Sequence, residues 1–380
     1  MNFELTEIQK QIQQTFKEFV DRKVKPCASA IDEKKEFPHN LFNEVGNLGF
    51  FGMRYPEHAG GSGLDITSYL LAVIELSRGP LSLAAACTMQ SLMGTFFLYR
   101  FGDKEIIENY FNAALTGKKI GGICMTEPNA GSDLFGINSI AKVTSNGFIL
   151  NGQKTWITSA PVADFFTVLA KTDNHEHLSI FFVPANLKGV MIGKAIEKLG
   201  VCGSLTSEVA FVDVELPKNY LLGQIGGGTK CLMEILAEIR IMTAALALGV
   251  ATAAYEDAVE YSKTRQQFGK TIGTFQAISM KLADMLVQLE TAKQYVFYAA
   301  WLSEKNMPRQ KEAMIAKLYA SECANSICDQ ATRIFASYGF AMEYPVQRYF
   351  RDARFTLIGG GTSEILKVNI GKEIQIGYNK

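Results

Sequence analysis

The first third of the chain places apolar residues at the three- and four-residue spacing of an amphipathic α-helix. In the opening segment, the apolar positions on one helix face are Leu5, Ile8, Ile12, Phe16, Phe19 and Val20. Thr6 followed by Gln9 predicts a capping box at the start of this helix. A Gly-rich break at 58–65 separates the early helices from further apolar helical segments that run to about residue 99. The pattern predicts a helical first part of the protein.

Near residue 120 the pattern changes to short runs rich in Val, Ile, Phe and Thr, which favour β-strands. The pairs Asn146-Gly147 and Asn151-Gly152 interrupt these runs and predict hairpin turns. After three glycines at 226–228 the helical period returns, with a short break at QFGKTIGTF. This order predicts an α+β protein in which a compact β domain separates two helical parts. A ligand pocket is expected where the β domain meets the helices.

Composition restricts the class of protein. The 380 residues contain 38 Lys plus Arg and 38 Asp plus Glu, so the formal net charge is zero. Such a chain lacks the excess of positive charge that is typical of proteins that bind nucleic acid or a membrane surface. We expect no signal peptide and no apolar run long enough to cross a bilayer, which predicts a cytoplasmic protein. The seven cysteines form no CxxC pair and predict reduced thiols. His175 and His177 lack an evident third ligand, so no metal is expected.

Two motifs in the β region offer groups that suit a planar ring. In CMTEPNAGSDL, the hydroxyls of Thr126 and Ser132 and the backbone N–H groups of the turn can bind a polar ring edge or a phosphate. The alternative is an ordinary capped turn. In NGQKTWITSA, Trp156 and Thr158 combine a flat aromatic side chain with a hydroxyl, which suits the face and edge of a planar cofactor. The alternative is a core tryptophan.

Two further motifs lie in the C-terminal helical part. In RQQFGKTIGTFQ, the forked guanidinium of Arg265 suits a pyrophosphate, and Gln276 can both donate and accept hydrogen bonds. The alternative is a surface arginine near a turn. In YFRDARFTLIGGGTSEI, three successive glycines at 359–361 precede Thr362, so the backbone can approach a ligand closely. The alternative is a flexible connector.

In their joint order and spacing, these motifs resemble the acyl-CoA dehydrogenase family over essentially the whole chain. The segments FELTEIQ and FPHNLFNEVGNLGFFGMRYPEHAGGSGLD are also similar to that family. The resemblance implies an N-terminal helical domain (1–118), a middle β-barrel-like domain (119–222) and a C-terminal four-helix bundle (223–380). It also implies FAD as the cofactor and an acyl thioester as the substrate.

The resemblance further implies which residues hold FAD and substrate. The implied FAD contacts are Met125, Thr126, Ser132, Trp156, Thr158, Arg265, Phe268, Gln276, Arg333 and Thr362. In the family, the positions matched by Arg265, Phe268 and Gln276 often act across a subunit boundary, which implies a homotetramer or homodimer. Arg333 stands where the family has a glutamine that packs on the FAD of a neighbouring subunit. The implied substrate contacts are Ser132, Arg240 and Gly361.

The family reaction transfers an α proton to a carboxylate and a β hydride to the flavin. The usual base is a glutamate in the final loop, where this chain has Gly360. The backbone N–H of Gly360 remains available for the thioester oxygen. Other members carry the base immediately before the position of Arg240, but this chain has Ile239 there. Glu238 lies one residue earlier than this position, so its side chain is rotated by about 100° around the helix. It is the candidate base if the helix is shifted or over-wound; otherwise it faces solvent or Arg240.

The resemblance leaves the carrier, the acceptor and the reaction itself open. The acyl group is expected on CoA or on an acyl carrier protein, and the electrons are expected to pass to an electron-transfer flavoprotein or to oxygen. One alternative is a flavin oxidase or monooxygenase of the same fold that acts on a substrate other than acyl-CoA. The missing base motivates another, a non-catalytic flavin-binding homologue.

Overall fold

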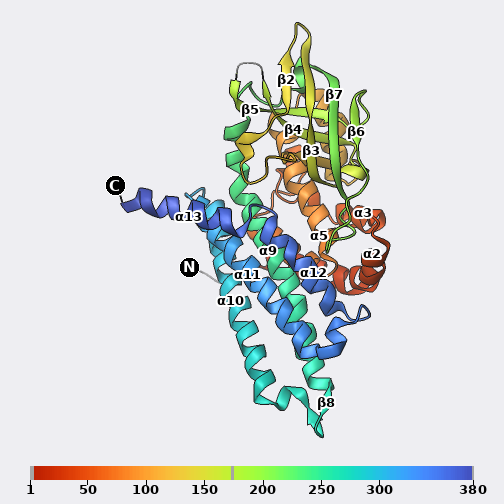
Figure 1. The fold of residues 1–380 in the computed structure, drawn as a ribbon, viewed down its shortest axis with the longest axis vertical. Coiled ribbons are helices and arrows are strands. Elements are labelled where there is room, and N and C mark those ends of the chain that lie inside the picture. The colour runs from red at the N-terminus through yellow and green to blue at the C-terminus, as the bar shows by residue number, and fades with distance from the viewer. Residues whose placement is uncertain (1–3, 173–174, 379–380) are drawn as a thin grey trace.

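The computed structural model describes residues 4–172 and 175–378. In Figure 1 a β-sheet lies at one end, and long C-terminal helices run from it to the other end, with the N-terminal helices packed beside both. The helices before the sheet are α1 (Glu7–Phe19), α2 (Ala28–Lys34), α3 (His39–Asn47), α4 (Ile66–Ser77), α5 (Leu81–Thr88), α6 (Phe96–Phe101), α7 (Lys104–Ile106) and α8 (Asn112–Leu115). The predicted order of helical, β and helical parts is confirmed.

The predicted capping box at the start of α1 is confirmed. The Gln9 N–H donates to Thr6 Oγ1 at 3.3 Å, and the Thr6 N–H donates to Gln9 Oε1 at 3.0 Å. The Gln9 side chain also donates to Asp65, which caps α4 by accepting the Ser68 N–H at 2.6 Å. The caps of α1 and α4 are therefore joined, and α4 is buried along most of its length between α1 and α9 (Gly228–Thr264).

The middle part forms a mixed sheet that packs against the helices on one side. Its strands are β1 (Gly121–Cys124), β2 (Ile140–Val143), β3 (Gly147–Thr158), β4 (Phe165–Thr172), β5 (His175–Pro184), β6 (Val190–Ile192) and β7 (Thr206–Pro217). β4 pairs in parallel with β1 and β2 and antiparallel with β5, while β3 joins β2 to β7 in antiparallel pairing. β6 extends the sheet beyond β7. β3 and β7, at 12 residues each, are the longest strands of the sheet.

One of the two predicted hairpin turns is wrong. The turn before Gly147 does connect β2 to β3, and the Thr144 N–H donates to the Gly147 carbonyl. Asn151 and Gly152, however, lie inside β3, where the pairing with β7 shifts register. Gly152 is there because β3 crosses closely over a neighbour: a Cβ at this position would lie 2.1 Å from Ser139 Oγ. The Asn-Gly pair marks a close backbone approach in a long strand.

The C-terminal part consists of α9, α10 (Gln276–Glu304), α11 (Gln310–Phe335), α12 (Pro345–Ile358) and α13 (Ser363–Tyr378). A two-stranded hairpin, β8 (Gln266–Gln267) with β9 (Lys270–Thr271), connects α9 to α10 at the end of the molecule farthest from the sheet (Figure 1). α9 is the central helix, packed against α4, α10, α11 and α12. α13 projects sideways from the bundle.

We expected no apolar run long enough to cross a membrane. This expectation is wrong if helices are judged by their length and composition alone. Two helical stretches, Leu81–Phe101 and Gly228–Thr264, meet that test among the described residues. Their most apolar windows are 89% and 83% buried inside the protein. They are apolar because each is surrounded by other helices, and a helix buried on all sides needs no polar face.

Candidate functional site

A buried ion pair joins the two motifs of the β region. Lys154 lies on β3, and its Nζ donates to Glu127 Oε1 at 2.8 Å and to the Met125 carbonyl at 3.2 Å. The Thr155 N–H donates to the Thr126 carbonyl at 2.9 Å. The loop after β1 is thereby fixed against the end of β3. Met125 and Thr126 stay half-buried at the surface of this platform.

The electrostatics of the pair follow from its burial. The side chains of Lys154 and Glu127 are 0% and 6% exposed. Burial raises the pKa of Glu127, but the Asn138 and Ser139 N–H donors and the Lys154 ammonium outweigh it, so the net pKa is lowered. Burial lowers the pKa of Lys154, and the neighbouring carboxylate opposes this change. Sequence reasoning missed both residues, although each stands inside a recognised motif.

Trp156 projects from this platform in an unusual conformation. Its φ is 59°, in the left-handed region, and the pairing of β3 with β7 shifts register between Lys154 and Ile157. The irregularity turns the indole outward, so that Trp156 is 57% exposed and is not a core tryptophan. Thr158 is half-buried two residues further on. An exposed flat ring held beside hydroxyls and backbone groups suits the isoalloxazine of FAD.

The glycine loop between α12 and α13 lies at the end of the bundle that faces the sheet (Figure 1). Gly360 and Gly361 have φ values of 72° and 104°, a region that favours glycine. A Cβ on Gly360 would lie 2.9 Å from Thr243 Oγ1 on α9. Lys317 on α11 donates to the Gly361 carbonyl at 2.6 Å, and the Thr362 hydroxyl accepts the Ile365 N–H at the start of α13. The loop is therefore held against both α9 and α11.

Two cations are buried beside this loop. Arg240 is 7% exposed, its Nε has no hydrogen-bond partner among the described residues, and its Nη1 lies 3.5 Å from Gln310 Oε1. Burial lowers the pKa of Arg240 to about 10. Burial also lowers the pKa of Lys317 to about 8; Glu322 opposes this change, and the charge of Arg240 adds to it. Sequence reasoning missed Lys317, which stands in an amphipathic helix without a motif.

Glu238 lies on an uninterrupted α-helix, because α9 is α-helical from Gly228 to Thr264. It neither faces solvent nor pairs with Arg240. Its Oε2 accepts a hydrogen bond from Arg54 Nη1 at 2.7 Å, and its Oε1 lies 3.7 Å from Arg309 Nη2. The shift or over-winding of the helix that would turn this carboxylate towards the glycine loop is not observed.

The other predicted FAD contacts lie at the far end of the bundle. Arg265, Phe268 and Gln276 surround the β8–β9 hairpin, which follows the C-terminal end of α9, at the end of the molecule farthest from the sheet (Figure 1). Phe268 is 92% exposed with φ 50°, and the Arg265 guanidinium lies over the Tyr338 ring. Arg333 is exposed and pairs with Asp329. One chain does not bring these residues to Trp156.

The remaining predicted residues stand at the surface or outside the described side chains. Ser132 is exposed on the loop after β1. His177 is exposed, and the side chain of His175 lies outside the described part. Within the part of the chain that the structure describes, no group of three or more His, Cys, Asp and Glu side chains is arranged to hold a metal ion.

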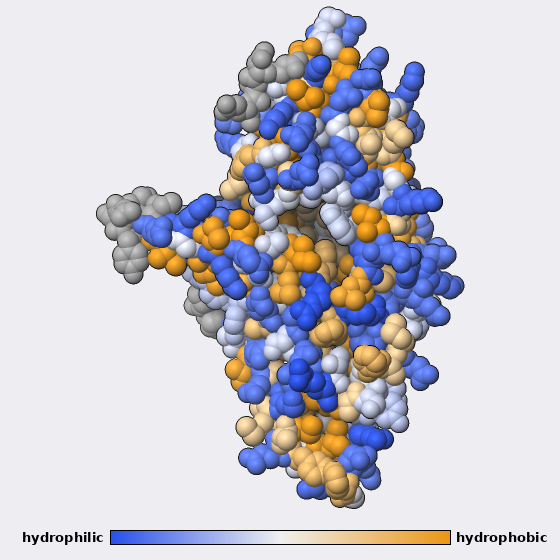
Figure 2. All heavy atoms as spheres, viewed as in Figure 1, coloured by the Kyte–Doolittle hydropathy of each residue, from blue (hydrophilic) through white to orange (hydrophobic). Residues whose placement is uncertain are grey.

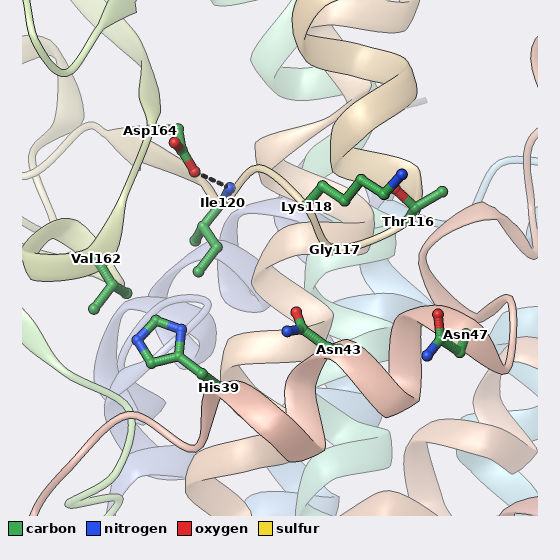
Figure 3. Close-up of a pocket in the computed structure, with 9 residues that line it drawn as sticks. All are labelled: His39, Asn43, Asn47, Thr116, Gly117, Lys118, Ile120, Val162 and Asp164. Carbon is green, nitrogen blue, oxygen red and sulfur yellow. Dashed lines mark hydrogen bonds between the residues drawn. The ribbon is translucent and has the colours of Figure 1, made fainter.

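A cavity of about 570 Å³ lies away from these motifs (Figure 3). It is bounded by α3 residues such as His39 and Asn43, by the connector before β1 and by the connector between β3 and β4. On its wall, Asp164 accepts the Ile120 N–H at 2.8 Å. Its lining contains none of the predicted site residues. The face drawn in Figure 2 also shows a hollow between the sheet and the helices below it.

The fold and the joined motifs define a flavoprotein with a helical, β and helical arrangement. The family models for the N-terminal, middle and C-terminal domains of acyl-CoA dehydrogenase match residues 6–118, 122–214 and 226–375. The chain belongs to the acyl-CoA dehydrogenase family. It is an FAD-dependent oxidoreductase that acts on CH–CH bonds.

Similar proteins cover nearly the whole chain. The chain is 55% identical to benzylmalonyl-CoA dehydrogenase of Aromatoleum aromaticum, over 98% of this chain and 100% of that protein. It is 37% identical to subunit CarC of the caffeyl-CoA reductase–Etf complex of Acetobacterium woodii, over 96% and 97% of the two chains. The structure of butyryl-CoA dehydrogenase from Megasphaera elsdenii matches with a TM-score of 0.95, 38% identity and coverage of 99% and 100%. An FAD complex of PigA matches with a TM-score of 0.95, 28% identity and 99% coverage of both chains.

Proposed function

We propose that this chain dehydrogenates the α,β carbon–carbon bond of an acyl-CoA thioester and passes the electrons to an electron-transfer flavoprotein. The observation that carries this proposal is the platform in which Lys154 and Glu127 join the Thr126 loop to Trp156. FAD supplies the hydride acceptor. Thr126, Trp156 and Thr158 hold and orient its ring, and Met125 and Thr362 complete the surroundings.

A CoA thioester is favoured over a carrier-bound acyl group by the names of the similar proteins. Benzylmalonyl-CoA, butyryl-CoA and caffeyl-CoA all occur in those names. The name of the caffeyl-CoA enzyme also includes Etf, which supports an electron-transfer flavoprotein rather than oxygen as the acceptor. We infer that the protein is soluble and cytoplasmic, with domains divided near residues 118 and 222.

A second copy of the chain completes the FAD site. Arg265 and Arg333 supply positive charge for the pyrophosphate, while Phe268 and Gln276 cover the adenine side. The position of the β8–β9 hairpin at the end of the molecule farthest from the sheet that carries Trp156 supports this arrangement (Figure 1). Exposed apolar side chains at the same end of the bundle, such as Phe268 and Phe340, support a homotetramer or homodimer.

The glycine loop and its neighbours orient the thioester. The Gly360 N–H donates to the thioester oxygen as negative charge develops there. Ser132 and Gly361 contact the acyl-CoA, and Arg240 stands beside the reacting carbons. If the reaction removes an α proton, Glu238 is the carboxylate on α9 that the sequence offers, once released from Arg54.

The chain contains two tryptophans, which allows a matched test of the platform. Bound FAD is expected to quench the fluorescence of Trp156 in a Trp301→Phe protein. The Trp156→Phe protein, which keeps Trp301 on α10, is expected to lose this quenching and to bind FAD at least tenfold more weakly. Anaerobic addition of acyl-CoA thioesters is expected to bleach the flavin of the wild type. Equal quenching in both variants, or no bleaching by any CoA thioester, contradicts the proposal.

A further inference from the structure

The surroundings of the glycine loop contain no free carboxylate at either position where the family places its base. Position 360 is a glycine in a left-handed conformation, against Thr243. Ile239 lies about 40° around α9 from Thr243, so its side chain lies on the side of the helix that meets the loop. Because this side chain is apolar, it cannot accept a proton. Glu238 is turned a further 100° or so away and is held by Arg54 at 2.7 Å. Two buried cations remain beside the loop, together with Glu322, whose Oε1 accepts the Ser363 hydroxyl at 2.7 Å.

Arg240 and Lys317 are these cations, and Arg240 has no counter-ion among the residues that the structure describes. Arg240 precedes Thr243 by nearly one turn of α9, so both side chains lie on the side of the helix that meets the loop. The influence of Arg240 on the pKa of Lys317 means that the two charges lie within electrostatic reach of each other. Among the residues that the structure describes, none forms a salt bridge with Arg240, and its Nε is buried without an acceptor. The Gly361 carbonyl contacts Lys317.

A buried guanidinium without an anion is unfavourable, because it has lost its hydration and gained no partner. Such a group persists at a functional site when a ligand supplies the missing charge. The thioester group of an acyl-CoA is neutral, and the CoA phosphates lie at the other end of that molecule. The anion must therefore belong to the acyl group itself, next to the carbons that react.

Building on the function proposed above, we propose that the substrate is a 2-carboxyacyl-CoA whose α-carboxylate binds Arg240, and that its loss as CO₂ replaces the removal of an α proton. The bond between the α-carbon and the carboxylate breaks, and its electron pair forms the α,β double bond. The β hydrogen leaves as hydride to FAD, the family's acceptor. The products are the α,β-unsaturated acyl-CoA, CO₂ and reduced flavin, with no proton taken up or released.

This chemistry accounts for the unusual features of the site together. Decarboxylation needs no base, so Gly360 can take the place of a glutamate, and Glu238 can remain paired with Arg54. The Gly360 N–H still stabilises the charge that develops on the thioester oxygen. When the carboxylate becomes neutral CO₂, its attraction to Arg240 disappears, which favours release of the product. Lys317 acts as a positioning residue, because it holds the Gly361 carbonyl and adds a second positive charge.

The first experiment compares thioesters that differ only in the α-carboxylate. The FAD-loaded wild type is mixed anaerobically with benzylmalonyl-CoA or 3-phenylpropanoyl-CoA, and with ethylmalonyl-CoA or butyryl-CoA. Flavin bleaching is followed, with release of isotopically labelled CO₂. We expect at least one carboxylated thioester to bleach the flavin about 100-fold faster than its partner and to release one CO₂ per flavin. We also expect no exchange of the α hydrogens of the plain thioesters with D₂O.

The second experiment measures binding without turnover. Malonyl-CoA carries an α-carboxylate but no β-carbon, and acetyl-CoA is its plain counterpart, so calorimetry reports affinity alone. Arg240→Met is expected to weaken malonyl-CoA binding about 100-fold, the effect of losing a charged hydrogen-bonded pair, and to leave acetyl-CoA binding unchanged. Arg240→Lys keeps the positive charge but loses the forked guanidinium that can donate two hydrogen bonds to one carboxylate, so it should recover part of the affinity. Arg22→Met, an exposed arginine 78% open to solvent, is the matched control.

The outcomes separate this inference from the dehydrogenase function. If a plain thioester bleaches the flavin as fast as its carboxylated partner, with α-hydrogen exchange in D₂O, the inference is overturned and the dehydrogenase stands. If no thioester bleaches the flavin, the proposed function fails, and calorimetry then decides the carboxylate site. Equal malonyl-CoA affinity of wild type and a folded, FAD-containing Arg240→Met protein would falsify that site.

Discussion

The pair formed by Lys154 and Glu127 predicts a large and specific effect of one substitution. Lys154→Met keeps the length and the apolar stem of the side chain but removes the ammonium group. Glu127 is then left as a buried carboxylate without its cation, while the Asn138 and Ser139 N–H groups still donate to it at 2.6 and 3.0 Å. Both motifs that flank the flavin lose their shared connection, since the Met125 carbonyl loses its donor as well.

The size of the effect follows from the geometry. Unit charges 2.8 Å apart attract each other by about 6 kcal/mol at an effective dielectric constant of about 20. Desolvation of both groups offsets part of this attraction, but removal of one partner leaves the desolvation of the other uncompensated, which costs about 3–5 kcal/mol. The two backbone donors that remain on Glu127 place the expected loss near the lower value, about 3 kcal/mol.

Urea unfolding at a fixed, saturating FAD concentration measures this loss. Lys154→Met is expected to lower the unfolding midpoint with little change in the slope, because the same surface is exposed on unfolding. Lys142→Met is the matched control, since Lys142 is exposed on the neighbouring strand β2, and it should change the free energy of unfolding by less than about 0.5 kcal/mol. A second substitution, Glu127→Gln in the Lys154→Met background, removes the orphaned charge and should restore about 1–2 kcal/mol.

Two results refute this reasoning. Equal unfolding midpoints for Lys154→Met and Lys142→Met would show that the buried pair adds no stability. A double variant no more stable than Lys154→Met would show that the orphaned Glu127 charge is not the source of the loss. FAD affinity gives an independent check, because loosening of the Thr126 loop is expected to weaken FAD binding along with stability.

Three further predictions concern the close approach in β3 and the cations near the glycine loop. Gly152→Ala should lower the free energy of unfolding by about 1–3 kcal/mol, because the new Cβ would lie 2.1 Å from Ser139 Oγ; Gly371→Ala, with nothing within 4 Å, should cause no loss. A drop no greater than the control's contradicts the close contact. Arg240→Met should unfold at no lower urea concentration than the wild type, because it removes a buried charge without a partner; a marked loss would reveal a counter-ion. Malonyl-CoA affinity should be constant below about pH 8 and fall by up to tenfold per pH unit above it, because Lys317 then loses the proton that binding requires. The affinity of the Lys317→Met protein should show no such fall. The charges around Lys317 come from Glu322, Arg240 and Glu364. A flat calorimetric pH profile in the wild type contradicts this assignment.

Local patterns in the sequence were sufficient for the elements and the family. The helical period predicted α1, and Thr6 with Gln9 predicted its capping box, because a cap depends on residues three apart. The change to β-branched and aromatic runs near residue 120 located the sheet. The order of the four motifs identified the family, since each motif keeps its own backbone geometry in a strand or loop. The Asn151-Gly152 turn failed because the same dipeptide also suits a strand that crosses close to Ser139.

The arrangement of charges around the site was decided only by tertiary structure. The sequence alone specified that Glu127, Lys154, Arg240 and Lys317 exist, and that position 360 lacks a carboxylate. Folding paired Glu127 with Lys154 across 27 residues, turned Glu238 towards Arg54, and left Arg240 buried without an anion from the described residues. Periodicity records which face of a segment is apolar, because that face is buried whatever covers it. Which charge meets which partner depends on the packing of segments far apart in the chain, and no local pattern carries that information.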